Sequence, residues 1–86
     1  MRLEGKVSII TGGGGGMGRV AAQLFAAQGA KVVVAEYSEA AGAETVDLVR
    51  AAGGTASFVK ADVANEADAK AMIDHALATY GRLDTL

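Results

Sequence analysis

The sequence contains no cysteine, no proline and no tryptophan among its 86 residues. Without cysteine it can form neither disulfide bonds nor thiolate metal sites, and no metal is expected. Without proline, the 12 glycines must provide most of the turns. No apolar run is long enough for a signal peptide or a membrane-spanning helix. These absences together predict a cytoplasmic domain with no membrane partner.

An excess of one charge is also missing. Eight Lys and Arg residues and ten Asp and Glu residues give a net charge of −2 at pH 7, and the basic residues are scattered singly. A nucleic-acid-binding surface would require a basic patch, so no nucleic-acid partner is expected. Hydrophobic residues form 51% of the chain, which excludes disorder and predicts one small domain over residues 1–86.

What the chain does have is a run of five glycines at residues 12–16. Residues 6–11, before the run, are mostly β-branched and predict a strand. After the run, apolar residues repeat with the spacing of one helix face, at Met17, Val20, Ala21, Leu24 and Phe25. A strand that turns through glycines into a helix points unpaired N–H groups, and the positive end of the helix dipole, at the turn. The loop therefore predicts a site for the phosphates of a nucleotide.

The glycine run fits two dinucleotide-binding fingerprints. Gly13, Gly15 and Gly18 fit G-x-G-x-x-G, and residues 11–18 fit the looser T-G-x-x-x-G-x-G. A Walker A loop fits less well, because Arg19 stands where that motif has its Lys. A cation in the first turn of a helix opposes the dipole, so Arg19 indicates either a nearby anion or an ordinary solvated side chain.

The rest of the chain alternates strands with helices. Strands are expected at residues 31–35 and 55–60, with the start of a fourth from residue 83. Helices are expected at residues 16–28, from a Ser38 cap to residue 52, and from an Asn65 cap to Tyr80. This βαβαβα order, followed by the start of a β-strand, predicts an α/β fold: a Rossmann-like, doubly wound parallel sheet of order 3-2-1-4, incomplete at residue 86. With its fourth strand cut short, the isolated 86-mer is expected to be poorly stable or to associate.

The helical periodicity also predicts which side chains face the core. The second helix should bury Val46, Val49 and Ala52. The third should bury Ala69, Met72, Ile73, Ala76, Leu77 and Tyr80. His75, the only histidine, falls on the polar side of the third helix and is expected to be a surface residue rather than a base.

Glu36 follows the second predicted strand, where a dinucleotide-binding fold places an acid against the adenosine ribose. A carboxylate there accepts hydrogen bonds from both ribose hydroxyls and repels a 2′-phosphate. Tyr37, the next residue, is also expected to contact the cofactor. Neither position 15 nor position 37, from which a cation could bind such a phosphate, carries Lys or Arg. The sequence therefore predicts NAD rather than NADP. The alternative is that Glu36 is an ordinary solvated residue at a strand end.

Five segments in this order resemble the amino-terminal part of a short-chain dehydrogenase/reductase, and together they span the whole chain. They are Leu3-x-Gly5-Lys6, residues 11–18, residues 32–36, Asp62-Val63 and residues 80–84. The resemblance implies that Gly12, Gly16 and Gly18 shape the turn around the pyrophosphate, with Met17 beside them. Gly15 of the same loop is also expected to bind the cofactor. It implies that Glu36 takes the position where NAD-dependent members more often carry Asp. It also implies that Asp62 bonds the adenine amino group while Val63 packs beside the ring.

The resemblance further implies an oxidoreductase that moves hydride between a nicotinamide and a carbonyl or alcohol, as a homodimer or homotetramer. The family's catalytic Ser and its Tyr–Lys pair, four residues apart, lie further along than residue 86. Neither Tyr37 nor Tyr80 has a Lys four residues on, so no catalytic residue is expected here. Two alternatives stay open: a non-catalytic NAD-binding module, and an S-adenosylmethionine-dependent methyltransferase, whose ligand has no phosphate for the glycine loop to hold.

Overall fold

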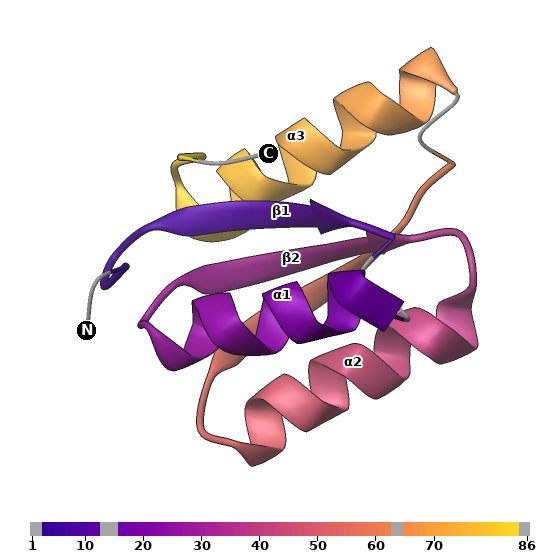
Figure 1. Ribbon diagram of the computed structural model, residues 1–86. Coiled ribbons are helices and arrows are strands. Elements are labelled where there is room, and N and C mark those ends of the chain that lie inside the picture. Colours follow the sequence, from indigo (N-terminus) through magenta and orange to yellow (C-terminus); the bar gives the residue numbers. More distant parts are fainter. Residues whose placement is uncertain (1–2, 13–15, 63–64, 85–86) are drawn as a thin grey trace.

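The computed structural model describes residues 3–12, 16–62 and 65–84. Strands and helices alternate along the chain, as β1 (Val7–Thr11), α1 (Gly16–Ala27), β2 (Lys31–Glu36), α2 (Glu39–Ala51), β3 (Thr55–Lys60) and α3 (Glu66–Tyr80). The strands are parallel and lie in the order β1-β2-β3 (Figure 1). The predicted βαβαβα, Rossmann-like α/β fold is confirmed.

The strands are in register, so they begin together and end together. Thr11 pairs with Ala35, and Glu36 pairs with Lys60. We call the side where the strands end the carboxyl end of the sheet, and the side where Val7, Lys31 and Thr55 lie the amino end. The chain leaves all three strands at the carboxyl end, where parallel sheets of this kind bind ligands.

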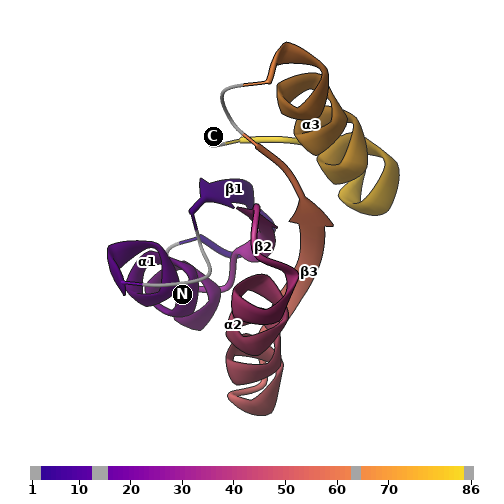
Figure 2. The same ribbon diagram turned by 90° about the vertical axis from the view of Figure 1, so that its right-hand side faces the viewer.

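Helices cover both faces of the sheet, with α1 and α2 on one face and α3 on the other (Figure 2). Val32 and Val34 of β2 belong to the cluster on the α1 and α2 face, whereas Val33 belongs to the cluster on the α3 face. All three are 0% exposed. The unbroken valine run of β2 is thus explained by burial on both faces, as expected for a central parallel strand.

Side chains cap the second and third helices where the sequence predicts caps. Ser38 Oγ accepts the Ala41 N–H at 3.3 Å, and Asn65 Oδ1 accepts the N–H groups of Ala67 and Asp68 at 2.9 and 3.2 Å. The Asp68 carboxylate also reaches back to the chain that follows β3, where its Oδ2 accepts the Asp62 N–H at 2.9 Å. The first turn of α3 is therefore tied to the carboxyl end of the sheet.

The apolar face of α1 that the sequence spacing indicates coincides only in part with its buried face. Met17, Val20 and Leu24 are 88%, 53% and 61% exposed, whereas Ala22 is 0% exposed and packs toward the sheet together with Phe25. The apolar arc of α1 is wider than the strip that contacts the sheet. The small Ala22 side chain lets the helix axis approach the strands, which leaves the outer part of the arc exposed among the described residues.

Three smaller expectations about α2 and α3 are also wrong. Ala52 is exposed because it is the residue that caps the end of α2 and lies beyond its last turn. Leu77 is 47% exposed. His75 is half-buried rather than a surface residue, because its Nε2 lies 3.1 Å from Ser57 Oγ of β3. The same hydroxyl accepts a hydrogen bond from Tyr80 Oη at 3.2 Å, so Ser57 draws both side chains against the sheet.

Asp84 is hydrogen-bonded to Val7 of β1, an edge strand of the described sheet, beside which the order 3-2-1-4 places a fourth strand. Its N–H donates to Val7 O at 2.9 Å, and its Oδ2 accepts the Val7 N–H at 2.8 Å. No strand is assigned to residues 82–84, and residues 85–86 lie outside the described part. Hydrogen bonds from the Arg82 guanidinium, and then from Val7, hold the pKa of Asp84 below its usual value.

Candidate adenosine and phosphate site

A pocket of about 180 Å³ opens at the carboxyl end of the sheet. It is lined by Gly12, Ala35, Glu36, Tyr37, Ala61 and Asp62. Four of these, Gly12, Glu36, Tyr37 and Asp62, are predicted site residues, and they come from segments that follow or end three different strands. In-register strands bring them together, because neighbouring parallel strands are about 4.8 Å apart.

The glycine loop has the backbone shape that only glycine adopts readily. Gly12 and Gly16 have φ of +64° and +52°. A Cβ at either position would meet no described atom within 4 Å, so the side of the loop is open to a ligand. The Gly12 N–H donates to Ala35 O at 2.9 Å, which anchors the loop beside the pocket. Gly15, a predicted site residue, lies outside the described residues.

The first turn of α1 follows this loop. Met17 is largely exposed and Gly18 is half-buried. Because α1 begins at Gly16, its first N–H groups lie at the end of the glycine loop, at the carboxyl end of the sheet. This arrangement fits the phosphates of a nucleotide, whose charge the positive end of the helix dipole would stabilise.

Glu36 ends β2. Its Oε1 accepts a hydrogen bond from the Ser38 N–H, with 3.4 Å between the nitrogen and the oxygen. This contact holds the carboxylate near the start of α2 and beside the pocket. Tyr37 is 68% exposed, and its ring centroid lies 5.6 Å from Nζ of Lys60, the last residue of β3. Sequence reasoning missed Lys60, although its pairing with Glu36 could have been found by aligning the starts of the second and third predicted strands.

Main-chain hydrogen bonds position Asp62 after β3. Its N–H donates to Asp68 Oδ2 at 2.9 Å, and its carbonyl oxygen accepts the Asn65 N–H at 2.9 Å. These bonds fix the backbone of an exposed residue at the rim of the pocket. Asp68 is therefore a positioning residue for Asp62. Val63, the other predicted residue here, lies outside the described part of the chain.

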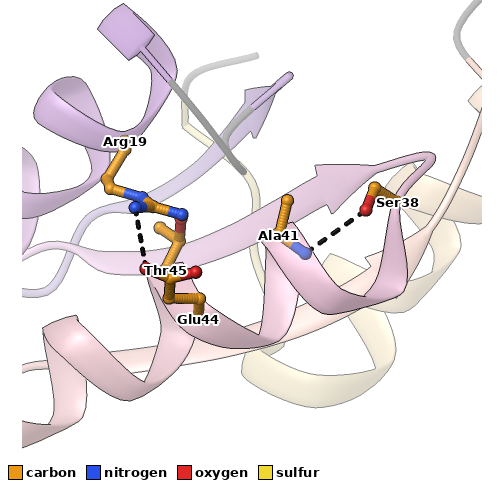
Figure 3. A network of polar contacts seen from close by, with 5 residues as sticks. All are labelled: Arg19, Ser38, Ala41, Glu44 and Thr45. Carbon is orange, nitrogen blue, oxygen red and sulfur yellow. Dashed lines mark hydrogen bonds and ion pairs between the residues drawn. The ribbon is translucent and has the colours of Figure 1, made fainter.

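Arg19 does lie close to an anion, but that anion is a carboxylate of α2. Figure 3 shows its guanidinium directed toward α2, where Nε donates to Thr45 Oγ1 at 3.0 Å and Nη1 lies 3.1 Å from Glu44 Oε1. Thr45 is 0% exposed. Arg19 thus joins α1 to α2, and the Glu44 carboxylate offsets the unfavourable position of a cation in the first turn of a helix. The simple solvated interpretation of Arg19 is wrong.

Other candidate sites were sought among the described residues. Two hollows of about 170 and 370 Å³ lie at the amino end of the sheet and share the small residues Ala26, Gly53 and Gly54. Within residues 3–12, 16–62 and 65–84, no group of three or more His, Cys, Asp or Glu side chains is placed to hold a metal ion. In the same ranges, every helix is too short or too polar to cross a membrane.

Comparison with known families agrees with this geometry. Residues 6–86 match the family model described as short chain dehydrogenase. An uncharacterised oxidoreductase of Thermotoga maritima is 49% identical over 84 residues, which cover 98% of this chain and 33% of that protein. The chain therefore spans about a third of the length of the curated relatives it matches.

Solved structures show the same likeness. A hydroxysteroid dehydrogenase from Escherichia coli superposes with a TM-score of 0.96 at 39% identity, over 99% of this chain and 36% of that one. A short chain dehydrogenase/reductase from Burkholderia phymatum in complex with NAD superposes with a TM-score of 0.92 at 43% identity. That match covers 96% of this chain and 30% of the Burkholderia chain.

Proposed function

The chain belongs to the short-chain dehydrogenase family, and we propose that residues 1–86 are the amino-terminal part of a single NAD-binding domain in an oxidoreductase. The enzyme would transfer hydride between a nicotinamide and a carbonyl or alcohol substrate. The observation that carries this proposal is the pocket that joins Gly12, Glu36 and Asp62 at the carboxyl end of the sheet. The catalytic Ser, Tyr and Lys would lie in sequence beyond residue 86.

Each side of the site would bind a different part of the cofactor. Gly12, Gly15, Gly16, Met17 and Gly18 would surround the pyrophosphate, where positive φ values and open space suit a close backbone approach. When bound, the nicotinamide would supply the hydride acceptor or donor. The residues of this chain would bind and orient it through the adenosine and phosphate half of the molecule.

The adenosine end would be recognised by carboxylates. Glu36 would accept hydrogen bonds from the ribose hydroxyls, and Tyr37 would border them. Asp62 would accept from the adenine amino group, with Val63 beside the ring. Because the Glu36 carboxylate would repel a 2′-phosphate, we propose NAD as the cofactor rather than NADP. The related Burkholderia structure in complex with NAD supports a nicotinamide cofactor.

The setting of the enzyme is also proposed. A cytoplasmic location is supported by a sequence without cysteine, which suits a reducing compartment. The family resemblance suggests a homodimer or homotetramer, with a small carbonyl or alcohol substrate and neither a nucleic-acid nor a membrane partner. Size-exclusion chromatography with light scattering would measure the oligomeric state directly.

Titration calorimetry tests the cofactor assignment. The chain is titrated with ADP-ribose, NAD, NADP and S-adenosylmethionine, and we expect ADP-ribose and NAD to bind, NADP to bind more weakly and S-adenosylmethionine not to bind. Equal affinity for NAD and NADP would refute the role of Glu36, and a preference for S-adenosylmethionine would favour a methyltransferase. Glu36→Gln should weaken NAD binding, whereas Asp74→Asn on the exposed side of α3 should leave it unchanged.

The non-catalytic module makes a different prediction. Such a module would bind NAD, yet the protein that contains this chain would show no dehydrogenase activity with any of a panel of alcohols. Reduction of NAD can be monitored by the absorbance of the reduced nicotinamide. This measurement therefore separates an oxidoreductase from a binding module.

A further inference from the structure

Lys60 places a positive charge beside the proposed ribose site, from a position that the usual fingerprints do not include. It ends β3, and its Cα pairs with that of Glu36 at the end of β2. Its Nζ lies 5.6 Å from the centroid of the Tyr37 ring, and Tyr37 lines the pocket. The ammonium group thus lies against a ring that borders the pocket, one strand away from the carboxylate that would bind the ribose.

The present partners of Lys60 hold it only weakly. Its Nζ is 4.0 Å from Glu39 Oε1, and the two side chains are 55% and 71% exposed. Ion pairs this exposed contribute little to stability, because solvent and salt screen them. The contact with the exposed ring of Tyr37 is of comparable strength. A phosphate dianion nearby would be a stronger partner, and the flexible lysine stem could turn toward it.

Carboxylates outnumber Lys60 around the ribose site, because Glu36 and Asp62 line the pocket and Glu39 lies 4.0 Å from Lys60. Lys60 favours an additional anion, whereas the Glu36 carboxylate borders the pocket and disfavours one. Removing the Glu36 charge would remove one of the carboxylates that repel an anion here, and a smaller side chain would also open space for a phosphate.

We propose that Lys60 is a second specificity residue of this site, able to bind the 2′-phosphate of an NADP-type ligand, and that Glu36 prevents it from doing so in the native chain. The inference rests on the proposed function, because it assumes that the pocket binds adenosine ribose. The choice between NAD and NADP would then depend on the opposing charges of Glu36 and Lys60.

Binding of two adenosine ligands to the full-length protein that contains this chain tests the inference. ADP-ribose and 2′-phospho-ADP-ribose, which differ only in the 2′-phosphate, are titrated into the native protein, Glu36→Ser, and Glu36→Ser combined with Lys60→Met. We expect Glu36→Ser to raise the affinity for 2′-phospho-ADP-ribose by about tenfold, and the added Lys60→Met to remove that gain. The gain should also shrink as sodium chloride is raised.

Lys31→Met provides the matched control. Lys31 makes the same kind of ring contact at the amino end of the sheet, with Nζ 5.8 Å from the Tyr80 centroid. In the Glu36→Ser background it should leave the gain intact, and far-UV circular dichroism of every variant checks the fold. If Glu36→Ser produces no gain, or if the gain survives Lys60→Met, the role of Lys60 is overturned. If the native protein binds neither ligand, the proposed function itself fails.

Discussion

At the amino end of the sheet, the Asp84 carboxylate accepts hydrogen bonds from Arg82 and from the main chain of Val7. At the carboxyl end, the carboxylates of Glu36 and Asp62 border a pocket. The two ends are built from similar residues, including carboxylates, positive-φ glycines and lysines above tyrosine rings. The two ends differ in what these residues contact. At the amino end, they mostly contact other residues of the protein.

This difference suggests that stability and ligand binding are divided between the two ends. The amino end holds the turns between helices and strands, where Gly29 and Gly54 lie against other residues, although Gly53 lies in open space. The carboxyl end holds glycines in open space and exposed acids. Substitutions at the amino end should therefore lower the free energy of unfolding, and substitutions at the carboxyl end should lower ligand affinity.

The largest expected effect is at Gly29, at the amino end. Its φ is +95°, and an added Cβ would lie 2.9 Å from the Glu4 Cα. Gly29→Ala should lower the free energy of unfolding by about 2–3 kcal/mol, since backbone strain and a main-chain clash add. Gly53→Ala is the matched control, with φ of +88° and open space, and should cost only about 1–2 kcal/mol. If urea unfolding shows equal losses of unfolding free energy for the two variants, the Glu4 main chain shifts at little cost.

Asp62→Ala should have the next largest effect, on binding instead of stability. The variant keeps both main-chain hydrogen bonds of residue 62 and loses the carboxylate proposed to contact the adenine. ADP-ribose affinity in calorimetry should fall by about tenfold, or about 1.4 kcal/mol. A drop in melting temperature larger than that of Gly53→Ala, with ADP-ribose affinity retained, would instead assign Asp62 a structural role and break the division between the ends.

Ser38→Ala tests an exception to this division, because Ser38 lies at the carboxyl end yet caps α2. Losing the hydrogen bond to the Ala41 N–H should cost about 1 kcal/mol of stability. ADP-ribose affinity should change much less, since Ser38 does not line the pocket. Ser38→Asn restores a capping side chain and should recover the stability. If Ser38→Ala leaves thermal unfolding unchanged, the cap contributes nothing.

The smallest effect is expected from the pH dependence of Asp84. Its pKa lies below the usual 3.8 in the folded chain, so its ionised form stabilises the fold above pH 3.8. That stabilisation is lost as pH falls from 3.8 through the lower, folded-state pKa. Asp84→Asn should therefore flatten the dependence of the unfolding free energy on pH below about 4. Parallel curves for the native chain and the variant would show that Arg82 and Val7 do not perturb this carboxylate.

The sequence predicted the elements and caps well because these depend on local residues. The bounds of β3 and the caps at Ser38 and Asn65 follow from neighbours within a few positions. The meeting of Glu36 with Asp62 follows from a rule of topology, since parallel strands end on the same side. Their roles toward a ligand stay predictions.

Contacts between elements were harder to predict. Helical spacing located an apolar arc on α1 but could not show that Ala22, rather than Leu24, faces the sheet. The bond between His75 and Ser57 depends on how closely α3 approaches β3. The position of Lys60 above Tyr37 likewise depends on side-chain directions across two strands. Such distances arise from packing between elements, which sequence spacing does not encode.

The in-register ladder of β2 and β3 also constrains how this family segment can evolve. Side chains alternate between the two faces along each strand, so one residue inserted within β2 would move Glu36 to the opposite face of the sheet. An insertion in the turn around Gly53, at the amino end, would leave that alternation intact. Length variation in descendants of this sequence should therefore accumulate in the amino-end turns, while the spacing between the glycine loop and Glu36 is preserved.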